Sequence, residues 1–444
     1  MKSSFAILYP EHIFTEEINQ IELNFIKERI TETLGDLYGM HWPFKQHKTS
    51  RNQIVLPYQE ELKKLGACFG TSGGFERPMW YALKGEKADY NYSFGYQNWY
   101  PSAEHETKNA RENVGLFELS PFSKFDLEGQ NVHEELQKIC TANIKDVEGR
   151  ATYTQMLNED GGIETDVTVT CLEKNHFRVI GPAATREHDK FHIKKHISEE
   201  VNFKDVTEDL TCLGLYGPNS RKLLSNISND DFTNEGIKFS HGKFVTIDGV
   251  KVWAQRLSYV GEIGFELYTN IDESKKLFLA IIKEGKNHGL SLCGAHAMDI
   301  MRMESGFLHW GHDISPEENQ YQAGLNFAIS YKKNINFVGK EALLKIKDKN
   351  PTKSLAMMVL KDNMPGEPLL LHEEPIYLDD KIIGRTTSGN YSFNFKKNIS
   401  FGYVNSGNSI EDLINKNLSI EVEKKKYPVT IIKKPLNQKN IKDI

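Results

Sequence analysis

Two acidic side chains interrupt stretches of the sequence that otherwise have strand character. Asp166 lies in residues 163–170, where apolar and polar residues alternate, and Glu266 lies in the apolar run 265–268. Acidic residues are depleted in strands, so each carboxylate needs a reason for its place. A carboxylate can take up or steer a proton, or accept two hydrogen bonds from a ring that presents adjacent N–H and NH2 donors.

Residues 153–170 are predicted to form the hairpin that positions Asp166. Two strand-like runs flank the segment NEDGG at 158–162, whose Asn, Asp and Gly residues favour turns. Because strand side chains alternate, Glu164, Asp166, Thr168 and Thr170 share one face, and Ile163, Thr165, Val167 and Val169 share the other. The polar face has two interpretations: a solvated outer surface, or the wall of a wet internal chamber.

Residues 258–268, which read SYVGEIGFELY, form the second group of interest. A glycine-punctuated turn separates Tyr259 from Glu266. Glu266 is either a surface residue on an edge strand or the partner of a ring such as a pterin or a guanine. The residues just before are predicted to form a hairpin around Asp248-Gly249, a pair that favours a two-residue turn.

Charge and composition exclude several classes of protein. The 444 residues are enough for two or three domains, and the net charge of −6 gives no electrostatic case for binding nucleic acid or an anionic membrane. The five cysteines are scattered and no His/Cys cluster has zinc spacing, which favours a cytoplasmic protein with reduced thiols and no metal. No signal peptide and no run near the ~20 apolar residues of a membrane span is evident.

The remaining chain gives a coarse order of elements. Residues 15–35 have helical periodicity, and residues 69–82, FGTSGGFERPMWYA, are predicted to be a loop because no GxGxxG motif follows a strand there. From about residue 352 the chain consists of short strands with Gly and Pro breaks, which indicates a small β-barrel or sandwich.

Three motifs in order, NEDGGIETD, SYVGEIGFELY and MDIMRMESGFLHWGHDI, resemble the glycine-cleavage T-protein family of folate-dependent aminomethyltransferases. The resemblance is closest to the folate-binding half of dimethylglycine and sarcosine dehydrogenases, and residues 337–343 and 399–404 continue it. It implies an α+β fold with three lobes around a folate cavity. The implied domains are an extension at 1–90 resembling the tail of a flavin module, a folate-binding domain at 91–350 and a C-terminal β-barrel at 351–444.

The resemblance also implies roles for four residues. Asp166 matches the family's catalytic aspartate beside the folate, Tyr153 and Tyr259 match folate-contacting tyrosines, and Glu266 matches the carboxylate that anchors the pterin edge. One departure is Met298, which stands where T-proteins have an arginine, so that a cation for the folate's glutamate tail is absent at that position. Arg302 and Glu304, in the same motif, are expected to form an intrahelical or core-satisfying pair.

The implied function is tetrahydrofolate-dependent transfer of an aminomethyl or methylene unit during demethylation of a small methylated amine, such as dimethylglycine or sarcosine, or of its iminium. Tetrahydrofolate is the expected cofactor. No flavin motif begins the chain, so FAD is expected in a separate subunit. Two alternatives are direct methyl transfer, as in dimethylsulfoniopropionate demethylases, and a non-catalytic folate-binding subunit. The segment SYVGEIGFE lacks the cysteine of the related iron–sulfur assembly proteins, which argues against the second.

Overall fold

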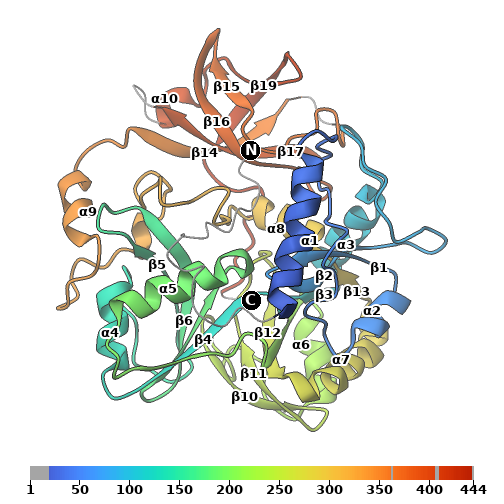
Figure 1. Ribbon diagram of the computed structural model, residues 1–444, viewed down its shortest axis with the longest axis vertical. Coiled ribbons are helices and arrows are strands. Elements are labelled where there is room, and N and C mark those ends of the chain that lie inside the picture. Colours follow the sequence, from blue (N-terminus) through green and yellow to red (C-terminus); the bar gives the residue numbers. More distant parts are fainter. Residues whose placement is uncertain (1–19, 362–363, 406–409, 443–444) are drawn as a thin grey trace.

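The protein has an α+β fold of three lobes in a computed structural model that describes residues 20–361, 364–405 and 410–442. Figure 1 shows a β-barrel at the top and two sheet-containing lobes below it. The predicted fold class and C-terminal barrel are confirmed. Within the described ranges, no helix combines the length and the hydrophobicity that crossing a bilayer requires. All five cysteines are free and buried, as predicted.

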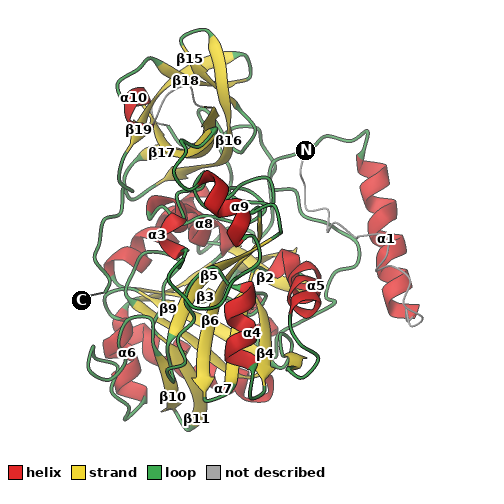
Figure 2. Cartoon of the chain, turned by 90° about the vertical axis from the view of Figure 1, so that its left-hand side faces the viewer, coloured by secondary structure: helices red, strands yellow, loops and turns green. Residues whose placement is uncertain are grey.

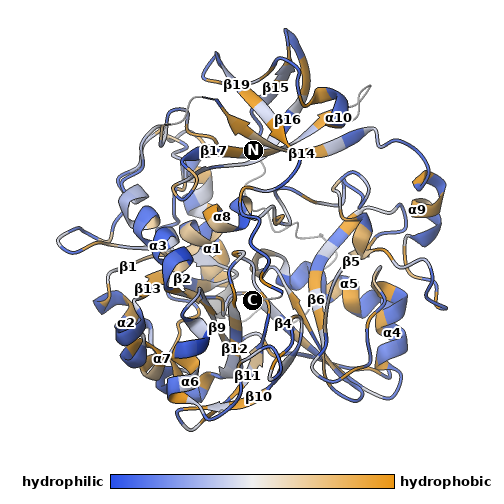
Figure 3. Cartoon of the chain, turned by 180° about the vertical axis from the view of Figure 1, so that it is seen from behind, coloured by the Kyte–Doolittle hydropathy of each residue, from blue (hydrophilic) through white to orange (hydrophobic). Residues whose placement is uncertain are grey.

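The first sheet contains the hairpin predicted around Asp166. Its strands, in spatial order, are β5 (Ala151–Leu157), β6 (Ile163–Glu173), β7 (His176–Gly181), β4 (Ser123–Glu128) and β8 (Asn202–Asp205). Helices α4 (Val132–Ile139) and α5 (Arg186–His196) bury Leu136 and Ile193 with the inward side chains Val167 and Val169. Bands of alternating hydropathy run along β6 (Figure 3), so the polar side chains, Asp166 included, point to the other side of the sheet.

The second sheet contains the hairpin predicted at Asp248-Gly249. Its strands, in spatial order, are β10 (Gly242–Ile247), β11 (Val250–Gln255), β12 (Gly264–Asn270), β9 (Leu210–Tyr216), β3 (Val114–Glu118) and β13 (Leu290–Cys293). Asp248 and Gly249 have φ values of 47° and 73°, as a two-residue hairpin turn of this kind requires. Helices α6 (Ser220–Ile227) and α7 (Ile271–Gly285) pack on this sheet through residues such as Leu223 and Leu277.

Residues 69–82, predicted to be a loop, instead form most of a β-hairpin. Strand β1 (Ala67–Ser72) pairs with β2 (Phe75–Tyr81) after the short helix α2 (Gln59–Lys64). The prediction was wrong because the Gly-Gly pair at 73–74 is a hairpin turn: both residues have positive φ, at 55° and 84°. Phe75 and Tyr81 share a core with Val252 of the second sheet, so this hairpin is part of that lobe. The domain boundary at residue 90 stays a prediction.

Helix α1 (Gln20–Asp36) stands beside the body of the molecule (Figure 2). Polar contacts hold it: Arg29 donates to the carbonyls of Thr49 and Ser50 at 3.0 and 3.2 Å, and Glu32 accepts from the amide of Lys48 at 2.7 Å. Its apolar side chains Leu23, Ile26, Ile30 and Leu34 are exposed. The predicted helix over 15–35 is confirmed from residue 20, and residues 15–19 lie outside the described part.

The C-terminal strands close into a barrel in the order β14 (Lys353–Leu360), β17 (Lys397–Asn405), β16 (Lys381–Ser392), β15 (Pro375–Leu378), β18 (Leu418–Val422) and β19 (Lys425–Ile432). The other described helices are α3 (Tyr100–Glu112), α8 (Ala295–Glu304), α9 (Lys340–Ile346) and α10 (Ile410–Leu413), with short 3-10 turns at Ala183–Thr185, Lys286–His288 and Asn326–Ala328.

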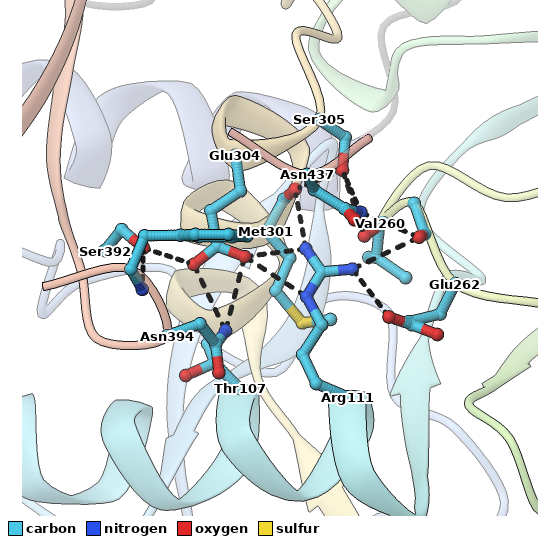
Figure 4. A network of polar contacts seen from close by, with 12 residues as sticks. Thr107, Arg111, Val260, Glu262, Met301, Glu304, Ser305, Ser392, Asn394 and Asn437 are labelled. Carbon is cyan, nitrogen blue, oxygen red and sulfur yellow. Dashed lines mark hydrogen bonds and ion pairs between the residues drawn. The ribbon is translucent and has the colours of Figure 1, made fainter. Parts of the chain in front are cut away.

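A buried polar network joins α3, α8 and the barrel (Figure 4). The carboxylate of Glu304 accepts hydrogen bonds from Arg111 at 2.6 Å and from Ser392 at 2.6 Å, and Arg111 also pairs with Glu262 at 3.0 Å. Arg302 does not pair with Glu304. It pairs with Asp299 and Asp313 instead, at 2.8 and 2.6 Å. The predicted pair between Arg302 and Glu304 is therefore wrong: each side chain is buried and bonded to other partners in the core.

Candidate functional site

A narrow hollow lies where the two sheets face each other, and polar side chains of β6 and β12 line it. Its wall consists of Thr168, Thr170, Leu172, Arg178, Ile180, Trp253, Gln255, Leu257, Glu266 and Tyr268. Asp166 lies on the same face of β6 as Thr168 and Thr170. Thr168 and Thr170 of the polar face of β6 therefore line a narrow internal hollow and do not form an outer surface. Glu266, from the opposite sheet, faces the same space.

A chain of buried amides holds Asp166 in place. The Gln155 Nε2 group, directly across the strand ladder, donates to Asp166 Oδ1 at 2.7 Å. Gln155 Oε1 in turn accepts from Gln320 Nε2 at 2.6 Å, and the same Gln320 nitrogen donates to Thr141 Oγ1 at 3.0 Å. Gln155, Gln320 and Thr141 are fully buried. Because Gln320 occupies the oxygen of Gln155, the amide of Gln155 must present its NH2 group to Asp166.

The half-buried Asp166 carboxyl titrates close to neutral pH. Burial raises its pKa to about 6, while Gln155 and the Tyr153 hydroxyl act to lower the pKa and the carboxyl of Asp189 adds a further rise. A group that gains and loses a proton in this range is suited to general acid–base chemistry, because both of its forms are accessible under physiological conditions. Both the fixed position of the Asp166 carboxyl and its raised pKa therefore suit a group that exchanges a proton.

Tyr153 lies beside Asp166 on the neighbouring strand. Its side chain is 38% exposed, and its ring stacks on that of Phe327 with centroids 6.3 Å apart. Burial of its hydroxyl raises the pKa of Tyr153 well above its usual value, so that the phenol is neutral and can donate a hydrogen bond. The ring offers an accessible aromatic face close to the carboxyl.

Glu266 is oriented by two tyrosines. Its Oε2 atom accepts a hydrogen bond from Tyr268 at 2.6 Å, and its Oε1 atom accepts one from Tyr216 at 3.4 Å. Burial raises the pKa of Glu266. Each carboxylate oxygen has a further lone pair, so Glu266 can accept additional hydrogen bonds from a ligand in the hollow.

Gln255, which the sequence reasoning missed, contributes an unused donor next to Glu266. The two residues are directly paired between β11 and β12. Gln255 Oε1 accepts from Trp253 Nε1 at 3.0 Å, whereas its Nε2 group is buried and has no hydrogen-bond partner among the described residues. A buried donor without a partner is unfavourable and requires an explanation. A ligand that brings an acceptor would satisfy this donor.

Tyr259 has a different environment from the other three predicted residues. Its hydroxyl donates to the Leu308 carbonyl at 2.8 Å, and its ring stacks on Phe307 with centroids 6.1 Å apart. Tyr259 also packs against the apolar cluster that includes Trp253 and Tyr268 of the hollow. It therefore adjoins the site through its ring, while its hydroxyl is already used.

The site thus brings together an acid–base group and a donor–acceptor pair. Glu266 and Gln255 together match a flat heterocycle whose edge carries N–H and NH2 donors beside a carbonyl, and Trp253 and Tyr268 supply aromatic walls. Among the described residues, no three His, Cys, Asp or Glu side chains are placed to hold a metal ion. None of the three glutamines carries a signal in the sequence, since glutamine is an ordinary surface residue.

Comparison with known proteins places this geometry in a family. Residues 58–333 match the GCVT N-terminal domain, and residues 353–437 match the glycine cleavage T-protein C-terminal barrel domain. A crystal structure of the glycine cleavage system aminomethyltransferase T from Bartonella henselae has the same fold, with a TM-score of 0.74 over 87% of this chain and 98% of that chain at 22% identity.

Two curated relatives are considerably longer than the part matched. The chain is 37% identical to 4-methylaminobutanoate oxidase (formaldehyde-forming) of Paenarthrobacter nicotinovorans, over 94% of this chain and 50% of the relative. It is 32% identical to mitochondrial dimethylglycine dehydrogenase of Rattus norvegicus, over 83% of this chain and 42% of the relative. The chain thus spans about half the length of these relatives.

Proposed function

The chain belongs to the glycine cleavage T-protein family, and from this membership we propose that it transfers a one-carbon unit from a small N-methylated amino acid to tetrahydrofolate. The observation that carries the proposal is the pair of opposed walls: Thr168 and Thr170 of β6, on the strand face that also carries Asp166, line the hollow from one sheet, and Glu266 with Gln255 lines it from the other. Dimethylglycine, sarcosine and 4-methylaminobutanoate are the candidate donors.

The donor and acceptor groups around the hollow suit the edge of a reduced pterin, and the two sheets must separate to admit the ring because the hollow measures only about 10 Å³ in this structure. A pterin edge presents N–H and NH2 donors beside a carbonyl, so Glu266 would accept from the donors and Gln255 Nε2 would donate to the carbonyl. When bound, tetrahydrofolate supplies a nucleophilic nitrogen that captures an electrophilic carbon. The aromatic side chains Trp253 and Tyr268 favour a flat ring between the two sheets.

Asp166 is proposed as the catalytic residue. Its ionised carboxylate can take the proton that is lost when the new carbon–nitrogen bond forms, and it would favour the positive charge that develops on the attacking nitrogen. Gln155 and Gln320 keep one oxygen of Asp166 in a fixed direction throughout. Walls that exclude water protect a reactive fragment and raise its effective concentration.

We further propose that a flavin-containing module oxidises the methylated amine before transfer. Removal of a hydride from the N-methyl group by the flavin would give the iminium that this site receives. The relatives named above are about twice as long as the part matched here, and α1 carries an exposed apolar face on the side away from its polar contacts. That face is the proposed contact surface for the flavin-containing module, whether it is joined to this chain or separate.

Titration of the purified chain with tetrahydrofolate in a calorimeter tests the proposal. We expect saturable binding of one reduced folate per chain. A matched titration of the Glu266→Gln variant with the same reduced folate tests the site, because weaker binding by the variant assigns the ligand to the hollow. Failure of the wild-type chain to bind tetrahydrofolate would contradict the proposal.

A further inference from the structure

Arg77, on strand β2, is a cation without a counter-ion among the residues that the structure describes. Its Nη2 group donates only to the thioether sulfur of Met298, at 3.7 Å, and its Nε group is buried without a hydrogen-bond partner. A thioether is a weak acceptor, whereas a guanidinium offers five N–H donors in a rigid fork. This arrangement leaves the Nε–Nη2 edge, the edge best suited to a carboxylate, essentially unused.

The two carboxylates that act electrostatically on Arg77, Glu118 and Asp299, already accept hydrogen bonds from other residues. Asp299 accepts from Arg302 at 2.8 Å and from Asn390 at 3.0 Å. Glu118 accepts from the backbone of Ser120 at 2.7 Å and also bonds the hydroxyl of Tyr58. Burial lowers the pKa of Arg77, with Glu118, Asp299 and Tyr259 acting weakly in the opposite direction. A guanidinium stays charged regardless, so the protein bears an uncompensated, desolvated charge.

Arg77 contacts the apolar cluster that contributes aromatic side chains to the wall of the hollow. The side chain that it touches, Met298, belongs to the apolar cluster that also contains Trp253 and Tyr268 of the hollow wall. The other arginine there is not available, because Arg178 makes two hydrogen bonds of 2.7 Å with Asp126. Arg77 is thus the cation that a ligand reaching beyond the hollow would meet.

We propose that Arg77 binds a carboxylate of a ligand through its Nε–Nη2 edge, with the flexible Met298 side chain turning aside to admit it. The inference rests on the proposed function, under which two ligands carry such a group: the glutamate end of the reduced folate and the acid group of the methylated amino acid. The sequence indicates that a cation is absent at position 298, and Arg77 supplies one beside that position from a different element.

Binding measurements on Arg77→Met and Arg77→Lys test the inference. Tetrahydrofolate is compared with tetrahydropteroate, which keeps the pterin and the benzoyl ring but lacks glutamate. If Arg77 binds the glutamate end, Arg77→Met weakens tetrahydrofolate about 10- to 100-fold and leaves tetrahydropteroate unchanged, since a charge-assisted bidentate pair is lost. Arg77→Lys keeps the positive charge but lacks the planar fork of donors, so its affinity for tetrahydrofolate should lie between those of the wild type and Arg77→Met.

A second arm addresses the other source of the carboxylate. With folate present, the binding of 4-methylaminobutanoate is compared with that of its amide, in which the carboxylate is replaced by a neutral group. If Arg77→Met weakens binding of the acid alone, Arg77 binds the carboxylate of the amino acid. The control Arg385→Met removes an arginine that is half exposed and paired with Glu373. It should leave the affinity for both ligands unchanged. Unaltered affinity for both carboxylates in Arg77→Met would overturn the inference while leaving folate binding by the wild type intact.

The melting temperatures of the variants show whether a loss of binding is due to loss of the folded structure. Removal of an unpaired buried charge is expected to leave the melting temperature of Arg77→Met unchanged or higher, because an apolar side chain there costs no desolvation. A clear fall in the melting temperature, accompanied by equal loss of tetrahydrofolate and tetrahydropteroate, would show that Arg77 only supports the fold and would also overturn the inference.

Discussion

Asp166 combines three properties that a catalytic carboxyl needs. It lies on the face of β6 that turns toward the second sheet, one of its oxygens is held by Gln155, and burial raises its pKa to about 6. The protein tolerates this cost in stability at one strand position, where a threonine like its neighbours Thr168 and Thr170 would be less costly. Features that are unfavourable for folding but suited to chemistry mark functional sites.

Asp166→Asn should raise the melting temperature at neutral pH. The folded-state pKa of about 6 exceeds the ordinary value of 3.8, so the folded protein binds this proton more tightly than the unfolded chain does. The stabilising contribution is present below pH 4 and is lost as the pH rises through 6. Thermal unfolding of both proteins from pH 4 to pH 8 should show the curves separating as the pH rises. A difference in melting temperature between the two proteins that stays constant from pH 4 to pH 8 would refute the raised pKa.

Glu266→Gln should weaken tetrahydrofolate binding more than it slows turnover at saturation. The loss of charge-assisted hydrogen bonds to the pterin edge costs about 1.5–3 kcal/mol. Calorimetric titration measures this, with Glu317→Gln as an exposed control on the loop after α8. Equal affinities for the wild type and Glu266→Gln would mean that Glu266 serves only its tyrosine partners.

At the scale of residues, the sequence identified the acids but not their supports. Asp166 and Glu266 are conspicuous because carboxylates are rare in strands. Gln155, Gln255 and Gln320 were missed because their importance depends on which buried atoms they meet, for example the Gln320 contact with Gln155 across 165 positions of sequence. The same applies to Arg77, which is of interest only because no carboxylate among the described residues pairs with it.

Helices α3 and α8 connect the second sheet to the barrel through a few buried charges. Arg111 of α3 reaches Glu304 of α8 and Glu262 of the turn before β12, and Glu304 also binds Ser392 of β16 (Figure 4). That turn leads directly to Glu266. The network therefore holds the strand that carries the proposed folate anchor.

Arg111→Met should destabilise the protein by about 3–5 kcal/mol, because it leaves the fully buried carboxylate of Glu304 without a cation. Urea-induced unfolding provides the measurement. The control Arg385→Met, which removes a surface pair, should cost only about 0–1 kcal/mol. If the two variants unfold at the same urea concentration, the network does not have this structural role.

At the scale of elements, local signals sufficed where the turn chemistry was distinctive. The hairpins around residues 158–162 and 248–249 were predicted because Asn, Asp and Gly allow the required backbone. The hairpin at 73–74 was missed because its glycines were judged only against a nucleotide-binding motif. Neither the pairing of the two sheets nor the place of β2 beside α8 follows from local pattern, since both depend on long-range packing.

The whole molecule corresponds to about half of its longer relatives. The hollow lies between the two sheets. Helix α1 stands beside the body of the molecule (Figure 2), and its apolar side chains are exposed. This length ratio is consistent with the proposed two-stage reaction, in which oxidation and capture of the one-carbon unit occur in different modules.

The purified chain should be colourless and should bind reduced folate but not FAD. We expect this because the folate-type motifs are present without a Gly-rich dinucleotide motif. The absorption spectrum of the purified chain, recorded before and after incubation with FAD and desalting, makes the measurement. Retention of one flavin per chain would contradict the proposed division of labour.

The most direct test of the central claim is the fate of a ¹³C-labelled N-methyl group, followed by NMR in the wild type and in Asp166→Asn with tetrahydrofolate and the oxidising flavoprotein present. The wild type should place the label in 5,10-methylene-tetrahydrofolate. Asp166→Asn should do so about 10²- to 10⁴-fold more slowly, with folate affinity changed much less. Near-normal turnover by Asp166→Asn would contradict a catalytic role for this carboxyl, and label found in 5-methyl-tetrahydrofolate would show direct methyl transfer instead.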